Sequence, residues 1–219
     1  VWFRPVLPGR DVALTLSLPL QQTMDSLLAG RRGCGVAMAV PSGEGLVRQV
    51  IAGREYFRRK FGARPRTAMN VDTFGHSRGL VQILAKSGYD SYLFCRPKLH
   101  ESSLPAAEFT WVGFDGSKVT AALAESHYNS PPGRAAEKVE EWLKHEPRKP
   151  VRQVPWGVGN HGGGPSREDL RSLRKLMERH QEAKILHSTP EAFFKDLKQN
   201  GNTLTVHGGD LNPWAVGCY

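Results

Sequence analysis

The sequence predicts an α/β fold in which strands and helices alternate, and three observations support this prediction. Residues 66–71 form a short apolar and β-branched run, apolar residues then recur at helical spacing up to Gly88, and residues 92–94 resume a strand. This order makes one strand–helix–strand unit. Polar and glycine-rich segments follow several expected strands, at the end where α/β sheets keep their ligands.

Composition limits the function classes. With 219 residues, 39% of them hydrophobic and 23% charged, the chain can bury one sizeable core, so one domain is expected. The formal net charge of +9 invites a nucleic-acid-binding interpretation. The basic residues are spread along the chain, however, and the densest run lies on and after an amphipathic helix, as on a solvated helix face. A nucleic-acid-binding module therefore stays an alternative, and no nucleic-acid partner is predicted.

Cysteine usage and apolar patterning bear on location. Cys34, Cys95 and Cys218 are odd in number and widely spaced, so reduced thiols and a cytoplasmic location are expected. No apolar run approaches the roughly 18 residues of a membrane span, and charges and prolines interrupt the first twenty residues, so we predict no membrane association and no signal peptide. A chain that begins with Val1 is expected to be processed or to be part of a longer one. Nothing in the pattern predicts an oligomeric state.

The individual elements follow the same alternation. Residues 1–35 give no long periodic segment and receive no function, whereas Ser42, a favourable N-cap, begins a helix expected to end at Phe61. Apolar residues of that helix form a stripe typical of a packing face. Beyond residue 94, the expected strands are 109–111, 118–121, 154–158, 183–186 and 204–206, and the expected helices are 135–145, one capped by Ser166, and 189–197.

Asp72 is the first candidate for chemistry, because it follows the strand of the strand–helix–strand unit. A carboxylate at a strand end can attack the anomeric carbon of a sugar, as in retaining glycosidases. The simpler alternative is that Asp72 caps the following helix.

A serine esterase is a second alternative. Residues 75–79, Gly-His-Ser-Arg-Gly, match the G-x-S-x-G elbow that exposes a nucleophilic serine in α/β-hydrolases. In that fold a glycine-rich loop precedes the elbow, whereas here the glycines at 162–164 follow it. The elbow serine should also lie directly at the strand end, but four residues separate Ser77 from Asp72. Asp72 is therefore the preferred candidate.

Six ordered segments resemble glycoside hydrolase family 38, the α-mannosidases. The residues 70–88 are similar to the family's Pro-Asp-x-Phe-Gly-[His/Tyr]-Ser segment, and residues 41–49 to its Pro-Ser-Gly-Glu-Ser-Leu-[Val/Ile]-Arg-Gln helix. Four further segments fall in the family's order: 92–97, 109–117, 157–165 and 208–219. The resemblance implies a distorted, barrel-like (β/α) catalytic domain of the glycoside hydrolase/deacetylase type, incomplete here and spanning residues 36–219.

The resemblance also implies roles for residues around Asp72. It makes Asp72 both nucleophile and zinc ligand in a retaining reaction on mannose-containing oligosaccharides, with Phe74 and His76 as substrate contacts. Arg96 follows the strand ending near Cys95, where its guanidinium could hold sugar hydroxyls or orient a carboxylate, or could form only a surface ion pair. Tyr128 could stack on a sugar ring, or be a core tyrosine.

The loop of residues 159–165 resembles the family segment that faces the nucleophile. Many members have an acidic residue where this chain has Asn160, and an amide cannot exchange a proton. Asn160 is therefore predicted to contact substrate. His161 is predicted to handle the proton, because its ordinary pKa is near neutrality, or else to contact substrate.

The chain also departs from the family. The family's upstream His and Asp zinc ligands are not recognisable, and a downstream His ligand would lie beyond Tyr219. A zinc site ordinarily takes several protein ligands. We therefore expect this chain alone to bind zinc poorly and to turn over little substrate.

Overall fold

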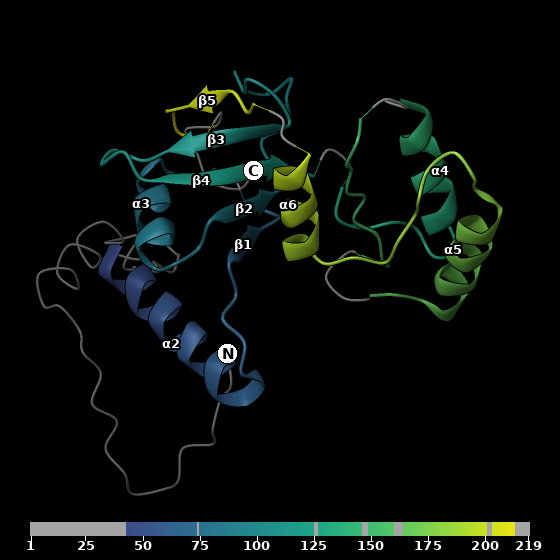
Figure 1. Cartoon of the computed structure of the whole chain (residues 1–219), viewed down its shortest axis with the longest axis horizontal. Helices are drawn as coiled ribbons and strands as arrows, with labels where there is room; N and C mark the ends of the chain where they lie inside the picture. The colour runs from purple at the N-terminus through teal and green to yellow at the C-terminus, as the bar shows by residue number, and fades with distance from the viewer. Residues whose placement is uncertain are drawn as a thin grey trace, which may run out of the picture. The chain divides into compact units, whose positions relative to one another are not determined.

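The computed structural model describes residues 43–73, 75–124, 127–145, 149–159, 164–200 and 203–212. The chain divides into two units, Val1–Glu44 and Gly45–Tyr219. Apart from the first two residues of the first helix, every described element lies in the second unit, shown in Figure 1. The predicted N-terminal segment 1–35 lies outside the described residues.

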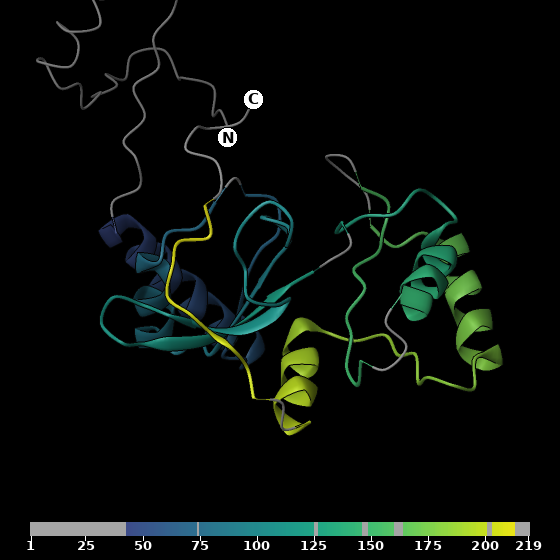
Figure 2. The same ribbon diagram turned by 90° about the horizontal axis from the view of Figure 1, so that it is seen from above.

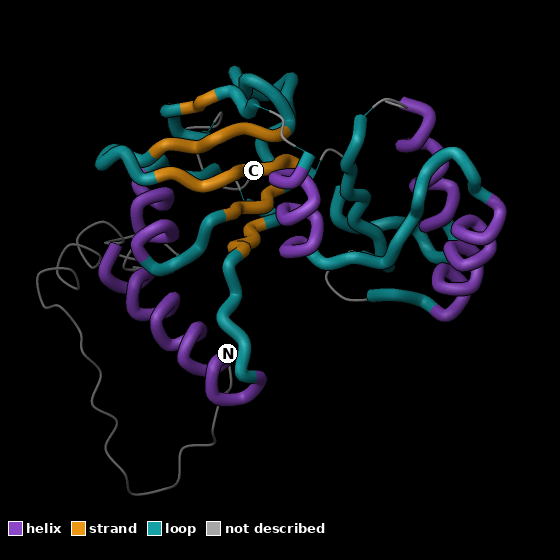
Figure 3. The backbone as a smooth tube through the Cα atoms, viewed as in Figure 1, coloured by secondary structure: helices purple, strands orange, loops and turns teal. Residues whose placement is uncertain are grey.

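Helices and strands alternate over residues 43–94 of this unit, after which strands follow one another and then helices do, as Figure 3 shows. The helices are α2 (Gly43–Phe61), α3 (Gly79–Lys86), α4 (Ala135–His145), α5 (Arg167–Arg179) and α6 (Pro190–Gln199). The strands are β1 (Thr67–Asn70), β2 (Ser91–Phe94), β3 (Glu108–Val112), β4 (Lys118–Leu123) and β5 (Val206–His207). None of the described helices combines the length and the apolar character needed to cross a bilayer.

The five strands form one mixed sheet in the order β1-β2-β4-β3-β5. Strands β1, β2 and β4 are neighbours and run parallel, with Asn70 beside Phe94 and Phe94 beside Leu123. Strand β3 joins β4 as an antiparallel hairpin, and β5 runs parallel to β3. The predicted α/β class is therefore confirmed, whereas the described strands make an open sheet rather than a closed barrel.

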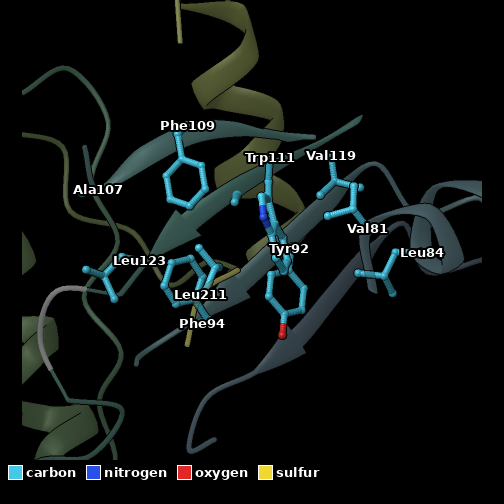
Figure 4. Packing of buried hydrophobic residues seen from close by; sticks show 11 residues of the cluster. Val81, Leu84, Tyr92, Phe94, Ala107, Phe109, Trp111, Val119, Leu123 and Leu211 are labelled. Atoms are coloured by element: carbon cyan, nitrogen blue, oxygen red, sulfur yellow. The ribbon is translucent and has the colours of Figure 1, made fainter. Parts of the chain in front are cut away.

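Side chains alternate between two apolar cores on opposite faces of the sheet. On β2, Tyr92 and Phe94 join the core that includes helix α3, whereas Leu93 packs with Phe193 and Phe194 of α6. Figure 4 shows the first core, in which Tyr92 and Trp111 lie close together. Fully burying an aromatic side chain of this kind contributes roughly 1.5–3 kcal/mol. These two cores fix the sheet whose edge carries the candidate site.

Helices α4 and α5 lie side by side around a third apolar cluster, and both views in Figures 1 and 2 show the pair. The predicted cap at Ser166 is confirmed, because its hydroxyl oxygen accepts a hydrogen bond from the backbone N–H of Asp169. The buried Asp169 carboxylate in turn accepts from the backbone N–H of Ala135 at 3.0 Å. One carboxylate therefore ties the first turns of the two helices together.

Three expectations differ from the structure. Residues 183–186 form no strand, and residues 154–158 contribute only one bridge, between Val158 and Ser130. Helix α2 has the predicted bounds, but none of its residues is buried, and Ile51 and Phe57 of its apolar stripe are exposed. Hydrophobic periodicity indicates a face without identifying what covers it.

Candidate active site

Three predicted site residues meet at one edge of the sheet. Asp72 follows β1, Arg96 follows β2 and Tyr128 follows β4. These three strands are adjacent and parallel, so their carboxyl ends share an edge. Placing Asp72, Arg96 and Tyr128 together is therefore a direct consequence of strand order.

The Asp72 carboxylate is held at both oxygens. Arg96 Nε lies 3.3 Å from Oδ1, and the Tyr128 hydroxyl donates a hydrogen bond to Oδ2 at 3.3 Å. The Asp72 side chain nevertheless remains 45% exposed, and that of Arg96 31% exposed. The carboxylate is thus oriented by the protein and still open to a ligand. The simpler role of helix cap is not observed, since the N-cap position of α3 is Arg78.

Tyr128 is set up to donate to this carboxylate. Partial burial, and then the charge of Asp72, raise the pKa of the Tyr128 hydroxyl, so it stays protonated near neutral pH. Its ring packs against the ring of His127, with centroids 4.4 Å apart. A tyrosine ring in this position offers a flat face beside the carboxylate.

Cys95 lies between β2 and Arg96 but is a poor candidate for chemistry. The side chain is buried, and burial raises the pKa of its thiol. A thiol that stays protonated is a weak nucleophile and a weak metal ligand. Its partly covered neighbour Val71 belongs to the same apolar core.

His76 lies beneath the site rather than on its surface. The residue is 3% exposed, and its Nε2 lies 2.8 Å from the Arg96 carbonyl oxygen while its Nδ1 lies 2.5 Å from the Tyr92 hydroxyl. The first contact requires Nε2–H to donate, so Nδ1 accepts from Tyr92. Burial lowers the pKa of His76, which favours this neutral form. The predicted substrate contact by His76 stays a prediction, and the geometry favours a role in holding the Arg96 backbone.

Ser77 lacks the surroundings of an esterase nucleophile in the described structure. Its side chain is exposed, and its oxygen accepts a hydrogen bond from the Gly79 N–H at 3.2 Å. The adjacent His76 ring is occupied by Tyr92 and Arg96 instead. The contacts described for Ser77 therefore offer no base to activate it.

The glycine-rich loop starts and ends beside the Tyr128 segment. Val158 pairs with Ser130, the Ser130 N–H donates to Gly157 O at 2.7 Å, and the Val158 N–H donates to Gly164 O at 2.9 Å. A side chain at Gly159 would clash with Asn129, so the close approach requires glycine. Three predicted site residues, Asn160 and His161 in this loop and Phe74 after Asp72, lie outside the described residues.

The profile described as "Glycosyl hydrolases family 38 N-terminal domain" matches residues 36–216. The chain belongs to glycosyl hydrolase family 38. The resemblance of the six ordered segments is therefore confirmed.

Relatives of this family 38 chain are α-mannosidases by name. It is 30% identical to "Alpha-mannosidase G" of Dictyostelium discoideum over 181 residues and 31% identical to human "Alpha-mannosidase 2C1" over 182 residues. Each alignment covers 78% of this chain, but only 16% and 17% of the respective relative. The fold is similar to that of a crystal structure of an α-mannosidase from Enterococcus faecalis V583, with a TM-score of 0.60 and 21% identity over 78% of this chain and 20% of that one.

The described residues of this family 38 chain do not by themselves fit a zinc site. No group of three or more His, Cys, Asp or Glu side chains gathers in the described part of the chain. The one carboxylate expected to bind zinc, that of Asp72, is contacted instead by Arg96 and Tyr128. A cation-binding Asp72 would need further ligands from elsewhere.

Two residues that sequence reasoning did not single out bond groups next to the predicted site residues. Tyr92 bonds the ring of His76, and Lys138 of α4 bonds backbone carbonyls on both sides of Tyr128. Tyr92 lies in the 92–97 segment but was expected only as a strand residue, and Lys138 lies in no motif. The partners of Lys138 are main-chain oxygens, which leave no signature in side-chain patterns.

Proposed function

We propose that this chain forms part of the catalytic domain of a retaining α-mannosidase in which Asp72 is the nucleophile. The observation that carries the proposal is the half-exposed Asp72 carboxylate, held by Arg96 and Tyr128 at the carboxyl edge of the sheet. Membership of family 38 and relatives named as α-mannosidases support the substrate class, a mannose-containing oligosaccharide.

In the proposed reaction, an oxygen of Asp72 attacks the anomeric carbon of a terminal α-linked mannose. The glycosidic bond breaks, a proton passes to the leaving oxygen, and a mannosyl–Asp72 ester forms. Water then attacks the anomeric carbon from the opposite face, the one that the leaving group left, and releases Asp72; the two inversions retain the configuration. Arg96 and Tyr128 hold the carboxylate in one orientation during attack, and the exposed face of Tyr128 is available for the sugar ring.

His161 is proposed to handle the proton, and Asn160 to contact substrate. The described ends of their loop lie beside Ser130, two residues after Tyr128, which supports this assignment. A histidine suits proton exchange near neutral pH. Phe74 is retained as a proposed substrate contact because it follows Asp72 by two residues.

Zinc is proposed only for a gene product that supplies further ligands, and no step above depends on it. The chain spans 16–17% of the length of the relatives it matches. The barrel-like closure expected for the family is likewise proposed only for a longer protein. We expect the isolated 219-residue chain to bind zinc weakly, measured by titration calorimetry, and to hydrolyse aryl α-mannoside poorly. Robust hydrolysis by the isolated chain would contradict this expectation.

A cytoplasmic location, expected from the cysteines, is also a proposal.

The test of the proposed function compares two aspartates in the full-length gene product. Asp72→Asn should lower kcat for an aryl α-mannoside about 10³-fold or more, because the nucleophile is lost. The control is Asp115→Asn in the β3–β4 turn, where the carboxylate accepts from the Ser117 N–H and pairs with Lys86. Activity of this control should stay within about 2-fold, since exposed ion pairs contribute little. Equal losses in both variants would refute the assignment of Asp72.

A further inference from the structure

Lys138 makes an unusual set of contacts for a lysine on a helix. From the first turns of α4, its ammonium donates to the carbonyl oxygens of His127, Asn129 and Pro155, the latter two at 2.7 Å. An ammonium has three N–H donors, so this geometry uses all of them. The side chain is therefore committed to main-chain groups rather than to an acidic partner.

The three carbonyls belong to the two segments that border the candidate site. His127 and Asn129 flank Tyr128, whose hydroxyl reaches Asp72. Pro155 lies just before Gly157 and Val158, which pair with Ser130 at the base of the glycine-rich loop. Lys138 thus joins the Tyr128 segment to the segment that enters the loop.

Converging carbonyl oxygens repel one another unless a cation lies between them. Hydrogen bonds from a charged donor are stronger than those between neutral groups, and all three carbonyls accept from the one ammonium. Removing the ammonium should therefore let these segments separate. Because Tyr128 lies between two of the bonded residues, its hydroxyl would lose its fixed distance to Asp72.

We propose that Lys138 is a positioning residue of the Asp72 site, holding the backbone of residues 127–129 so that Tyr128 orients the nucleophile. This inference rests on the proposed function for its kinetic consequence, but its structural consequence is independent of activity. Lys138 touches neither Asp72 nor the ring of Tyr128 through any described hydrogen bond. Its effect on catalysis therefore passes through the backbone.

A double-mutant cycle in the full-length gene product tests the kinetic part. Lys138→Met keeps the aliphatic stem and removes the ammonium, and it should lower kcat about 10-fold, as should Tyr128→Phe. In the Tyr128→Phe background, Lys138→Met should cost less than about 2-fold more, because the interaction it supports is already absent. If Lys138→Met lowers kcat by the same factor with and without Tyr128→Phe, the proposal is overturned, because a general structural role acts equally in both backgrounds.

Amide hydrogen exchange tests the structural part without substrate. In Lys138→Met, exchange should quicken about 10-fold or more at Ser130 and Val158, whose N–H groups donate to Gly157 O and Gly164 O, while the sheet core stays protected. The control is Lys144→Met, since Lys144 is an exposed lysine near the end of the same helix. This control should leave the exchange rates of these amides unchanged. Should Lys138→Met fail to fold, Lys138→Arg, which keeps the charge but moves the donors, should give the same local pattern. Unchanged exchange in a folded variant would overturn the inference, whereas an active Asp72→Asn enzyme would overturn only the proposed function.

Discussion

Tyr128 donates a hydrogen bond to Asp72 Oδ2 at 3.3 Å, although the two lie 56 positions apart in the chain. The contact spans the ends of two strands, β1 and β4, that flank β2 in the sheet. It brings a neutral donor to a carboxylate whose other oxygen faces Arg96.

Tyr128→Phe should lower kcat about 10-fold or more, with a smaller change in KM. The charged Asp72 carboxylate then loses the hydrogen bond that the Tyr128 hydroxyl donates to it. The measurement is steady-state hydrolysis of an aryl α-mannoside by the full-length gene product. Tyr56→Phe is the control, since Tyr56 is an exposed residue of α2. A Tyr128→Phe enzyme with unchanged kcat would show that the hydroxyl does not act on Asp72.

Arg96→Lys should also lower kcat, by about 10-fold, because the ammonium lacks the planar donors that face the carboxylate. Arg134→Lys provides the control, because Arg134 forms an ion pair with Glu137 in which both side chains are exposed. If both substitutions leave kcat unchanged, Arg96 forms only a surface ion pair.

Because His76 is buried, we expect the folded chain to lose stability on mild acidification. Burial lowers its folded-state pKa below the ordinary value of 6.5, so below pH 6.5 the unfolded chain binds a proton that the folded chain does not. The free energy of unfolding should therefore fall as the pH is lowered through this window. Denaturant titrations between pH 7.5 and about 5 measure the slope. In His76→Asn the slope should be shallower, and an unchanged slope would contradict the account.

The sequence predicted much of the local structure because local signals determine it. Helix α4 was expected at 135–145, and Ser166 was expected as a cap. Asp72, Arg96 and Tyr128 could be placed at one edge because each follows a strand, and parallel strands share that edge.

The failures concern features that depend on distant partners. Three of the four residues 183–186 are apolar, which suggests a strand, but a strand needs a neighbouring strand, and the pattern does not supply one. The burial of His76 could not be predicted, because the aromatic side chains that cover it come from β2 and not from its own segment. The contacts of Lys138 were unpredictable because main-chain carbonyls attract it.

The central claim is that Asp72 becomes covalently bonded to mannose. The most direct test treats the full-length gene product with a fluorinated mannosyl donor carrying a good leaving group, followed by mass spectrometry of the digested protein. The account predicts one fluoromannosyl group on the peptide that contains Asp72, and none in Asp72→Asn. A label on another carboxylate or on Ser77, or no label in an enzyme that hydrolyses mannosides, would contradict it.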